Sequence, residues 1–308
     1  MFSIILIMLT ALTLGMTGAN NASNSAGTVA GSKVTSYSYG ILIFVAGVTA
    51  GALLEGGKLA GAIQGRTLEG ALSTKSLEII LGVTFSMILV ATAMKLPLPI
   101  TQAVFGASIG SGLYLGIPFN MPGITIVLVS WALTPFIAAV ISLALSEFLH
   151  RRTINSVGGS VMVYGILTIL ASFYTAYCFG TNTLGLIAGV VKDDLGWYVA
   201  VITGVAATSV GGMVAGERVS RTVGERISSL GPPTAFASQV GGALTVHFFT
   251  QGGIPVSISQ AIIGGVSGGG LAKGAKALNR ETSVKLALLW STTPVFSVLM
   301  AWLLHAVS

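Results

Sequence analysis

Two runs of the sequence share a proline that is followed by hydroxyl and amide side chains. They cover residues 96–113 and 254–271, at an offset of 158 residues. A helix that begins just after a proline presents free backbone N–H groups and the positive end of its dipole. Two such helix starts can hold an oxyanion with hydroxyls and amides and without a basic cluster. The side chains suited to this are Thr101, Gln102, Ser257, Ser259 and Gln260.

An alternative interpretation is that these prolines and glycines only kink packed helices, with the hydroxyls bonded back to the preceding helical turn. A single copy of the run would favour that alternative. Because the run occurs twice in the same order, we expect an anion site.

A second pair of polar runs lies earlier in each half of the chain. Residues 18–28 are dense in Asn and Ser, and residues 180–185 are a more degenerate copy. Amide and backbone oxygens can coordinate a small cation where a helix unwinds, and the same amides can donate to an oxyanion. The alternative is a polar external loop. Candidates for the coupling ion or the anion are Asn20, Asn21, Asn24, Asn182 and Thr183, with sodium expected at Asn20, Asn24 and Asn182.

The elements that position these side chains must be stable in lipid. Only 8% of the 308 residues are Asp, Glu, Lys or Arg, whereas soluble proteins carry about 25%. A hydrophobic content of 53% and a mean hydropathy of +0.89 would leave large apolar patches on any surface in water. The net charge of +6 includes no basic run longer than Arg151-Arg152, which excludes a nucleic-acid partner. We expect a multi-pass protein of the cell membrane.

The hydropathy pattern predicts an all-α polytopic membrane protein. A helix needs about 20 mostly apolar residues to cross the hydrocarbon. Segments that meet or approach this length lie near 2–16, 38–57, 77–95, 122–149, 160–180, 196–216, 231–250 and 284–306. Between them, 17–32, 97–116, 180–192 and 253–272 are rich in Gly, Ser, Thr and Asn. Such backbone survives in lipid only when protein buries it or when it lines a wet cavity, so we expect broken or re-entrant helices at the midplane.

The chain consists of two homologous halves. Besides the proline runs, residues 18–20 match 180–182 and residues 56–59 match 216–219, at offsets of 162 and 160. We place the halves at 1–150 and 151–308, joined by a basic connector. Two long repeats of inverted topology are typical of secondary transporters, whose substrate site lies at the repeat interface near the bilayer midplane. The many glycines are also compatible with a homodimer.

At these segments the sequence resembles the inorganic phosphate transporter (Pit) family, which also contains sulfate permeases. Residues 18–20 with Asn24 fit the family's Gly-Ala-Asn-Asp-Val-Ala-Asn motif, and Gly180 with Asn182 fits its repeat. Residues 253–257 with Ser259 fit the Pro-Val-Ser-Thr-Thr-His motif. The resemblance implies an inverted-repeat transporter in which hairpin tips hold the anion while the Asn/Asp motifs hold coupling sodium.

Several positions depart from the family pattern. Asn21 and Thr183 stand where the family has Asp, Gln102 and Gln260 where it has His, and Leu186 where it has the last Asn. An amide lacks the full charge with which a carboxylate holds a cation in low dielectric, which weakens the case for sodium symport. Hydrogen phosphate needs an acceptor for its proton and sulfate does not. The missing carboxylates thus favour sulfate, while the family favours phosphate. Of the two, we rank phosphate as the first expected substrate.

Two ionisable residues in apolar stretches are candidates for proton coupling. Glu55 ends an apolar stretch, where its other interpretation is an ion pair with Lys58 at i+3. His247 can relay a proton, or it can be a buried histidine whose hydrogen bonds are satisfied. The sequence by itself does not decide between proton coupling and an ion pair for Glu55, or between a proton relay and a buried histidine for His247.

Enzymatic motifs such as H-E-x-x-H, the P-loop and the nucleophile elbow are absent from the sequence. We therefore expect a transporter rather than an enzyme, driven by a sodium or proton gradient and without another cofactor. Its partners would be inorganic phosphate or sulfate and the lipid bilayer. The rival functions are an oxyanion-selective channel and a non-transporting membrane scaffold.

Overall fold

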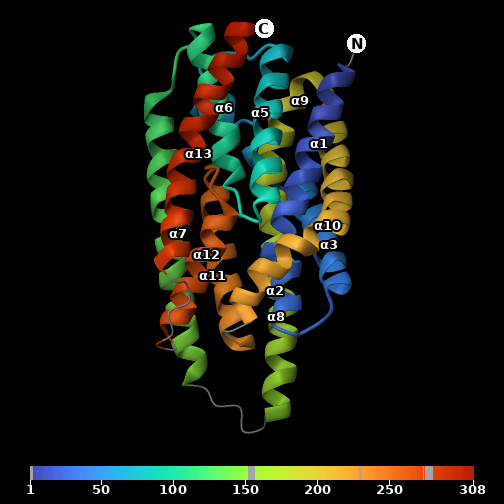
Figure 1. Cartoon of the computed structure of the whole chain (residues 1–308), viewed down its shortest axis with the longest axis vertical. Coiled ribbons are helices and arrows are strands. Elements are labelled where there is room, and N and C mark those ends of the chain that lie inside the picture. The colour runs from blue at the N-terminus through green and yellow to red at the C-terminus, as the bar shows by residue number, and fades with distance from the viewer. Residues whose placement is uncertain (1–2, 152–156, 229–230, 273, 275–279) are drawn as a thin grey trace.

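Every regular element is helical in the computed structural model, which describes residues 3–151, 157–228, 231–272, 274 and 280–308 (Figure 1). The first half contains α1 (Ile4–Asn21), the 3₁₀ turn η1 (Ala22–Asn24), α2 (Ala26–Gly31), α3 (Tyr37–Glu55), the 3₁₀ turn η2 (Gly56–Leu59), α4 (Ala62–Arg66), α5 (Thr74–Ala93), α6 (Ile100–Leu115) and α7 (Met121–His150). The second half contains α8 (Val157–Phe179), the π turn η3 (Gly180–Leu184), α9 (Gly185–Leu195), α10 (Trp197–Ser228), α11 (Pro232–Gln251), α12 (Ile258–Leu271) and α13 (Arg280–Val307).

Within the described residues, seven helical segments are long and apolar enough to cross a membrane by length and composition. They are Ile4–Gly31, Tyr37–Arg66, Thr74–Ala93, Met121–His150, Val161–Leu195, Trp197–Glu217 and Val284–Val307. Large apolar side chains on the outer helices are exposed, among them Phe136 of α7, Val214 of α10 and Val295 of α13. Such a surface is suited to lipid and not to water. The chain is a multi-pass membrane protein, as its composition predicts.

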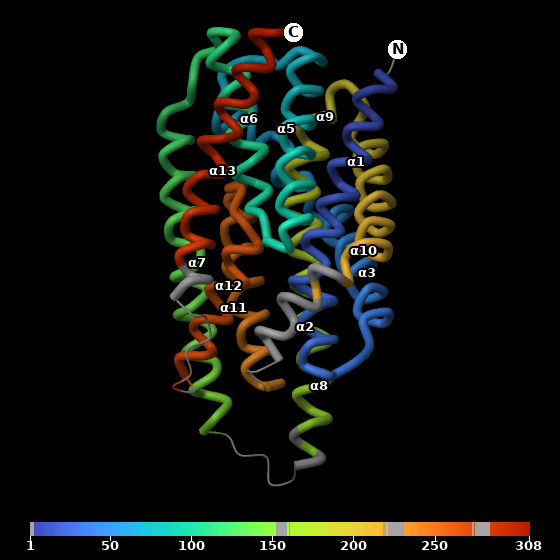
Figure 2. Tube along the Cα trace, viewed as in Figure 1, coloured from blue at the N-terminus to red at the C-terminus, as the bar shows by residue number. Residues whose placement is uncertain are grey.

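Two helical hairpins enter the molecule from opposite ends and turn near its middle (Figures 1 and 2). The first hairpin is α5 and α6 with its tip at 94–99, and the second is α11 and α12 with its tip at 252–257. The stretches 77–95 and 231–250, both expected to be complete spans, are the first arms of these hairpins. By length and composition α5 could still cross a membrane, whereas α11 is not among the seven segments that could. The first arms end just before Lys95 and Gly253, which have positive φ. The prolines that follow, Pro97, Pro99 and Pro255, keep the tips from continuing as helix.

Two long helices are interrupted where the sequence is polar. α1 continues through η1 into α2, and α8 continues through η3 into α9. Every residue of 17–29 and of 178–191 is buried. Burial rules out the polar external loop that was the alternative for residues 18–28 and 180–185. The expectation of broken helices is confirmed for these two segments.

The two halves pack against each other through equivalent contacts. α1 lies beside α10 and α3 beside α8, while α6 packs on α13 and α12 on α7 (Figure 2). A methyl group on Gly106 of α6 would lie 2.5 Å from the carbonyl oxygen of Pro294, and one on Gly264 of α12 would lie still closer to that of Pro135. These glycines therefore allow the second arm of each hairpin to pack closely on a proline-containing helix of the other half. The inverted repeat is present. The boundary between the halves at 150/151 stays a prediction, because it adjoins residues 152–156, which lie outside the described chain.

Candidate functional site

The tips of the two hairpins bring Gln102 and Gln260 together between the halves. Nε2 of Gln102 donates to Oε1 of Gln260 at 3.4 Å, across the 158-residue offset of the repeat. Gln102 lies in the first turn of α6, Gln260 lies in the first turn of α12, and both side chains are buried. Equivalent residues of inverted repeats meet only near the pseudo-two-fold axis, so this contact marks the centre of the repeat interface.

The other predicted anion ligands lie in the same two helix starts and are buried. Ser257 caps α12, where its Oγ accepts a hydrogen bond from the Gln260 N–H at 3.3 Å. Thr101 and Ser259 lie in the first turns of α6 and α12. Oγ1 of Thr101 and Oε1 of Gln102 have no hydrogen-bond partner in the described structure. A buried polar atom without a partner costs about 1–3 kcal/mol, so a ligand that bonded to these two atoms would recover that free energy.

The broken first helix contributes amides to the second hairpin. Nδ2 of Asn24 donates to Oδ1 of Asn21 at 2.9 Å and to Oγ of Ser259 at 3.2 Å. Oγ of Ser259 also donates to Oδ1 of Asn21, at 3.0 Å. All three side chains are buried. Residues of the first half thus form one polar cluster with the second hairpin, as expected for a site at the repeat interface.

Asn20 holds the tip of the first hairpin. Its Nδ2 donates to Oγ1 of Thr92 and to the carbonyl oxygen of Leu96, both at 3.0 Å. Its Oδ1 accepts from the N–H of Leu98 at 3.2 Å. Because the hairpin engages both ends of the amide, Asn20 positions the tip in this conformation.

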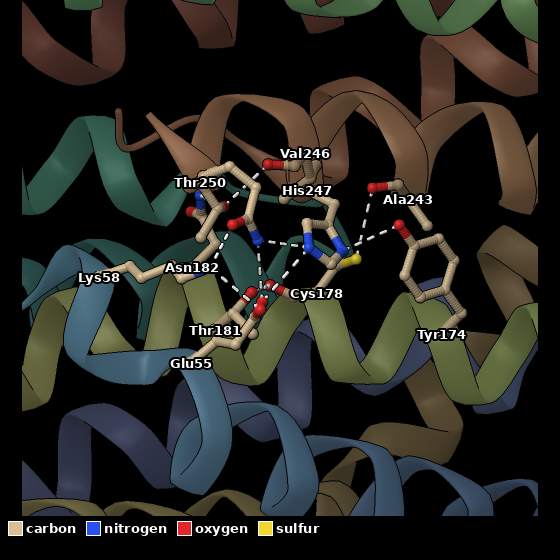
Figure 3. Close-up of polar contacts among 11 residues, drawn as sticks. Glu55, Lys58, Tyr174, Cys178, Thr181, Asn182, Ala243, Val246, His247 and Thr250 are labelled. Carbon is tan, nitrogen blue, oxygen red and sulfur yellow. Dashed lines mark hydrogen bonds and ion pairs between the residues drawn. The ribbon is translucent and has the colours of Figure 1, made fainter. Parts of the chain in front are cut away.

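Asn182 makes the equivalent contact in the second half (Figure 3). Its Nδ2 donates to Oγ1 of Thr250 at 2.8 Å, whereas its Oδ1 has no partner. Asn182 and Thr183 are buried in the π turn η3, a distortion that is frequent at functional sites. An amide oxygen of this kind can bind sodium or accept a hydrogen bond from the protonated oxygen of hydrogen phosphate. The Asn182 amide thus has an oxygen without a partner, whereas both ends of the Asn20 amide are engaged, and the roles of both residues stay predictions.

Sequence reasoning missed several residues of this site. Thr92 and Thr250 are separated by the same 158 residues as the proline runs, and this repetition of a threonine could have identified them. Gln239 of α11 donates to the carbonyl oxygen of Asn24 at 3.3 Å, and its Oε1 has no partner. Gln239 gives no such signal, because Leu81 stands at its equivalent position.

Two further residues of the first half hold the tip of the second hairpin. Nε1 of Trp131 donates to the carbonyl oxygen of Pro255 at 2.8 Å. Nε of Arg66 donates to the carbonyl oxygen of Gly253 at 2.8 Å, and its guanidinium also reaches that of Gly252. A cavity of about 480 Å³ beside this tip includes Lys58 and Arg66 in its lining. Lys58 and Arg66 place positively charged side chains in the lining of this cavity, beside the tip.

Glu55 and His247, separate candidates in the sequence, lie together (Figure 3). Oε1 of Glu55 pairs with Nζ of Lys58 at 3.0 Å, so the ion pair at i+3 is present. Oε2 of the same carboxylate lies 3.3 Å from Nε2 of His247 in the other half. His247 thus contacts a carboxylate, and its side chain is 24% exposed. It is neither an isolated nor a fully buried histidine.

The hairpin tips and the broken segments are free of carboxylates. Residues 17–31, 94–102, 178–191 and 252–260 contain no Asp or Glu. In the part of the chain that the structure describes, no group of three or more His, Cys, Asp and Glu side chains could hold a metal ion. An anion here would meet neutral donors and helix starts, and sodium would have to rely on amide and carbonyl oxygens.

Comparison with known proteins agrees with this arrangement. The sequence profile of the phosphate transporter family matches residues 17–169 and 155–301. A candidate phosphate permease of Methanocaldococcus jannaschii is 27% identical over 291 residues, covering 94% of this chain and 92% of that protein. The sulfate permease CysP of Bacillus subtilis is 24% identical over 293 residues, covering 93% and 82%.

A solved structure described as the sodium-dependent phosphate transporter has a TM-score of 0.80 to this chain, at 20% identity and with 99% of each chain covered. The two therefore share a fold. Because the family profile matches both halves, the chain belongs to the phosphate transporter family.

Proposed function

We propose that this chain is a secondary active transporter of inorganic phosphate, which works by alternating access and is driven by a sodium or proton gradient. The observation that carries the proposal is the buried contact between Gln102 and Gln260, which joins two inverted hairpin tips. Transporters with inverted repeats bind their substrate at such an interface, near the midplane. The anion ligands would be Thr101, Gln102, Ser257, Ser259 and Gln260.

Phosphate is supported by the family and by the candidate phosphate permease among the relatives. The site chemistry adds a reason. A protonated phosphate oxygen needs an acceptor, and Oε1 of Gln102 and Oδ1 of Asn182 are buried acceptors without a partner. Hydroxyl and amide donors would hold the remaining oxygens, as hydrogen bonds to a charged group are about twice as strong as neutral ones.

Sulfate is the second candidate substrate. The sulfate permease CysP is a relative over most of both chains, and the site lacks the carboxylate that would accept a phosphate proton. A fully ionised sulfate would use the same donors and leave the amide acceptors unpaired, which costs free energy. We therefore rank phosphate before sulfate.

The coupling ion would bind near the broken helices or at a separate ionisable site. Sodium at Asn24 and Asn182 would use amide and backbone oxygens alone, because Asn21 and Thr183 are neutral. Protons would use Glu55 and His247 instead.

Uptake by the purified protein in proteoliposomes tests the proposal. Labelled phosphate, in competition with sulfate, is offered under an imposed sodium gradient, an imposed proton gradient, or neither. We expect accumulation above the external concentration under at least one gradient. A channel would equilibrate the label without accumulating it, and a scaffold would neither bind nor move either anion. Either result would contradict the proposed function.

A further inference from the structure

Glu55 and His247 form a contact between the two halves (Figure 3). Glu55 ends α3, and His247 lies on α11, one helical turn before its last residue, Gln251. Oε2 of Glu55 and Nε2 of His247 are 3.3 Å apart, and the two side chains are 23% and 24% exposed. We propose that this pair is the proton-binding site that couples a proton gradient to anion transport. The proposal rests on the proposed function and names its coupling ion.

The groups that face the pair come from three elements. η2 contributes Lys58, whose Nζ is 3.0 Å from Oε1 of Glu55. α11 contributes Gln251, whose Nε2 donates to Oε2 of Glu55 at 3.0 Å. α8 contributes Tyr174, Tyr177 and Cys178, of which the thiol donates to the carbonyl oxygen of Ala243 at 3.3 Å. Lys58 balances the charge of the carboxylate, and an imidazole is a side chain that can take up and release a proton.

Both protonation states of His247 keep their hydrogen bonds. The hydroxyl of Tyr174 lies 2.9 Å from Nδ1 of His247. A neutral imidazole with its proton on Nδ1 donates to this hydroxyl and accepts at Nε2 from the amide of Gln251, whose nitrogen contacts it. A second proton on Nε2 faces Oε2 of Glu55 at 3.3 Å, while the Gln251 amide keeps its hydrogen bond to that carboxylate. The proton can therefore bind and leave without creating an unpaired buried group.

The pair is linked to the tip of the second hairpin. Gln251, which contacts Glu55 and Lys58, is followed by the tip at 252–257. Arg66 of the first half holds two carbonyl oxygens of the same tip. A proton on His247 adds a positive charge next to Gln251, which also contacts Lys58 and directly precedes the tip.

This arrangement favours joint binding of a proton and an anion. Positive charge near the tip strengthens anion binding, and by reciprocity a bound anion strengthens proton binding. Joint binding is the energetic requirement for symport. The predicted anion ligands are themselves neutral, and Asn21 and Thr183 replace the aspartates of the family motif. A proton that is carried by the protein must therefore bind outside that group, as it does at His247.

The test uses the full-length protein in proteoliposomes that contain a pH-sensitive dye. An inward phosphate gradient without a pH gradient should drive protons inward with the parent protein. In His247→Asn we expect phosphate-evoked proton movement to fall about tenfold or more, and an inward proton gradient should no longer increase phosphate accumulation. Glu55→Gln should act in the same direction. The titration of phosphate itself is common to all variants, so the difference between variants isolates the protein site.

Matched controls are His150→Asn and Glu78→Gln, which should behave as the parent does. His150 is bonded to the Ser146 carbonyl oxygen at the end of α7, and Glu78 accepts from Ser3. Thermal stabilisation by phosphate shows that each variant is folded and binds.

The outcomes separate the two proposals. If His247→Asn or Glu55→Gln still accumulates phosphate in response to a proton gradient as the parent does, the site assignment is wrong. If the parent accumulates phosphate and a proton gradient has no influence, the coupling proposal fails while the proposed function stands. A parent that neither moves nor binds phosphate or sulfate overturns the proposed function itself.

Discussion

Gln102 of one hairpin donates a hydrogen bond to Gln260 of the other, so that equivalent residues of the two repeats meet in the buried centre of the protein. The family motif has histidine at these positions, and this chain has amides. An amide offers a donor and an acceptor and carries no charge at any physiological pH. The centre of the site can therefore recognise an oxyanion without itself titrating.

Gln260→Leu removes these polar atoms while roughly conserving volume. A hydrogen bond to a charged group contributes about 1.5–3 kcal/mol, so we expect the Kd for phosphate to rise about 10- to 100-fold. Titration calorimetry on the purified protein measures this. Gln64→Leu is the matched control, because Gln64 makes an exposed contact with Asp193. A Kd for Gln260→Leu within twofold of the parent value would exclude Gln260 as a ligand.

Asn21→Asp restores the carboxylate of the family motif. Its oxygen would lie where Asn24 and Ser259 now donate at 2.9 and 3.0 Å, and a carboxylate in low dielectric attracts a cation. We expect a sodium gradient to stimulate phosphate uptake by the variant about fivefold more than uptake by the parent. Asn120→Asp, at the N-cap of α7, should show no such gain. Equal sodium responses in both variants would count against a cation site beside Asn21.

Asn20→Ala and Asn182→Ala separate positioning from ion binding. Asn20 makes three hydrogen bonds to the first hairpin, and Asn182 makes one to Thr250. At about 1 kcal/mol for each bond, Asn20→Ala should lose more stability and have the lower Tm. Thermal unfolding in detergent without phosphate compares the two. A lower Tm for Asn182→Ala would reverse the assignment of Asn20 as the residue that holds a tip.

Gly264→Ala tests the close packing of the second hairpin on α7. The added methyl group would collide with the carbonyl oxygen of Pro135, and overpacking costs about 1–3 kcal/mol. We expect a lower Tm and a loss of uptake. Gly82→Ala is the control, because no atom lies within 4 Å of the added methyl group and alanine is the better helix former. If both variants unfold at the same temperature, the contact is not tight.

The sequence predicted the architecture well where polar residues interrupt an otherwise apolar chain, because such residues are unusual in lipid. Polar runs at 18–28 and 180–185 in an apolar chain indicated broken helices, and both segments are broken and buried. The stretches 77–95 and 231–250, expected as complete spans, are arms of hairpins, and of the two α5 alone is apolar enough to cross a membrane. Proline positions mark those turns, although a proline in an apolar chain also occurs inside complete helices such as α7.

The sequence by itself determined that the chain lies in lipid, that it repeats, and that its predicted anion ligands are neutral, since these follow from residue types and their order. Only the tertiary structure decided which polar groups meet. Asn20 turns to the first hairpin while Asn21 joins Ser259, and Glu55 contacts His247 of the other half. Arg66 and Trp131 reach the second tip in the same way. These contacts depend on how the two inverted halves cross, and no local pattern of residues specifies that crossing.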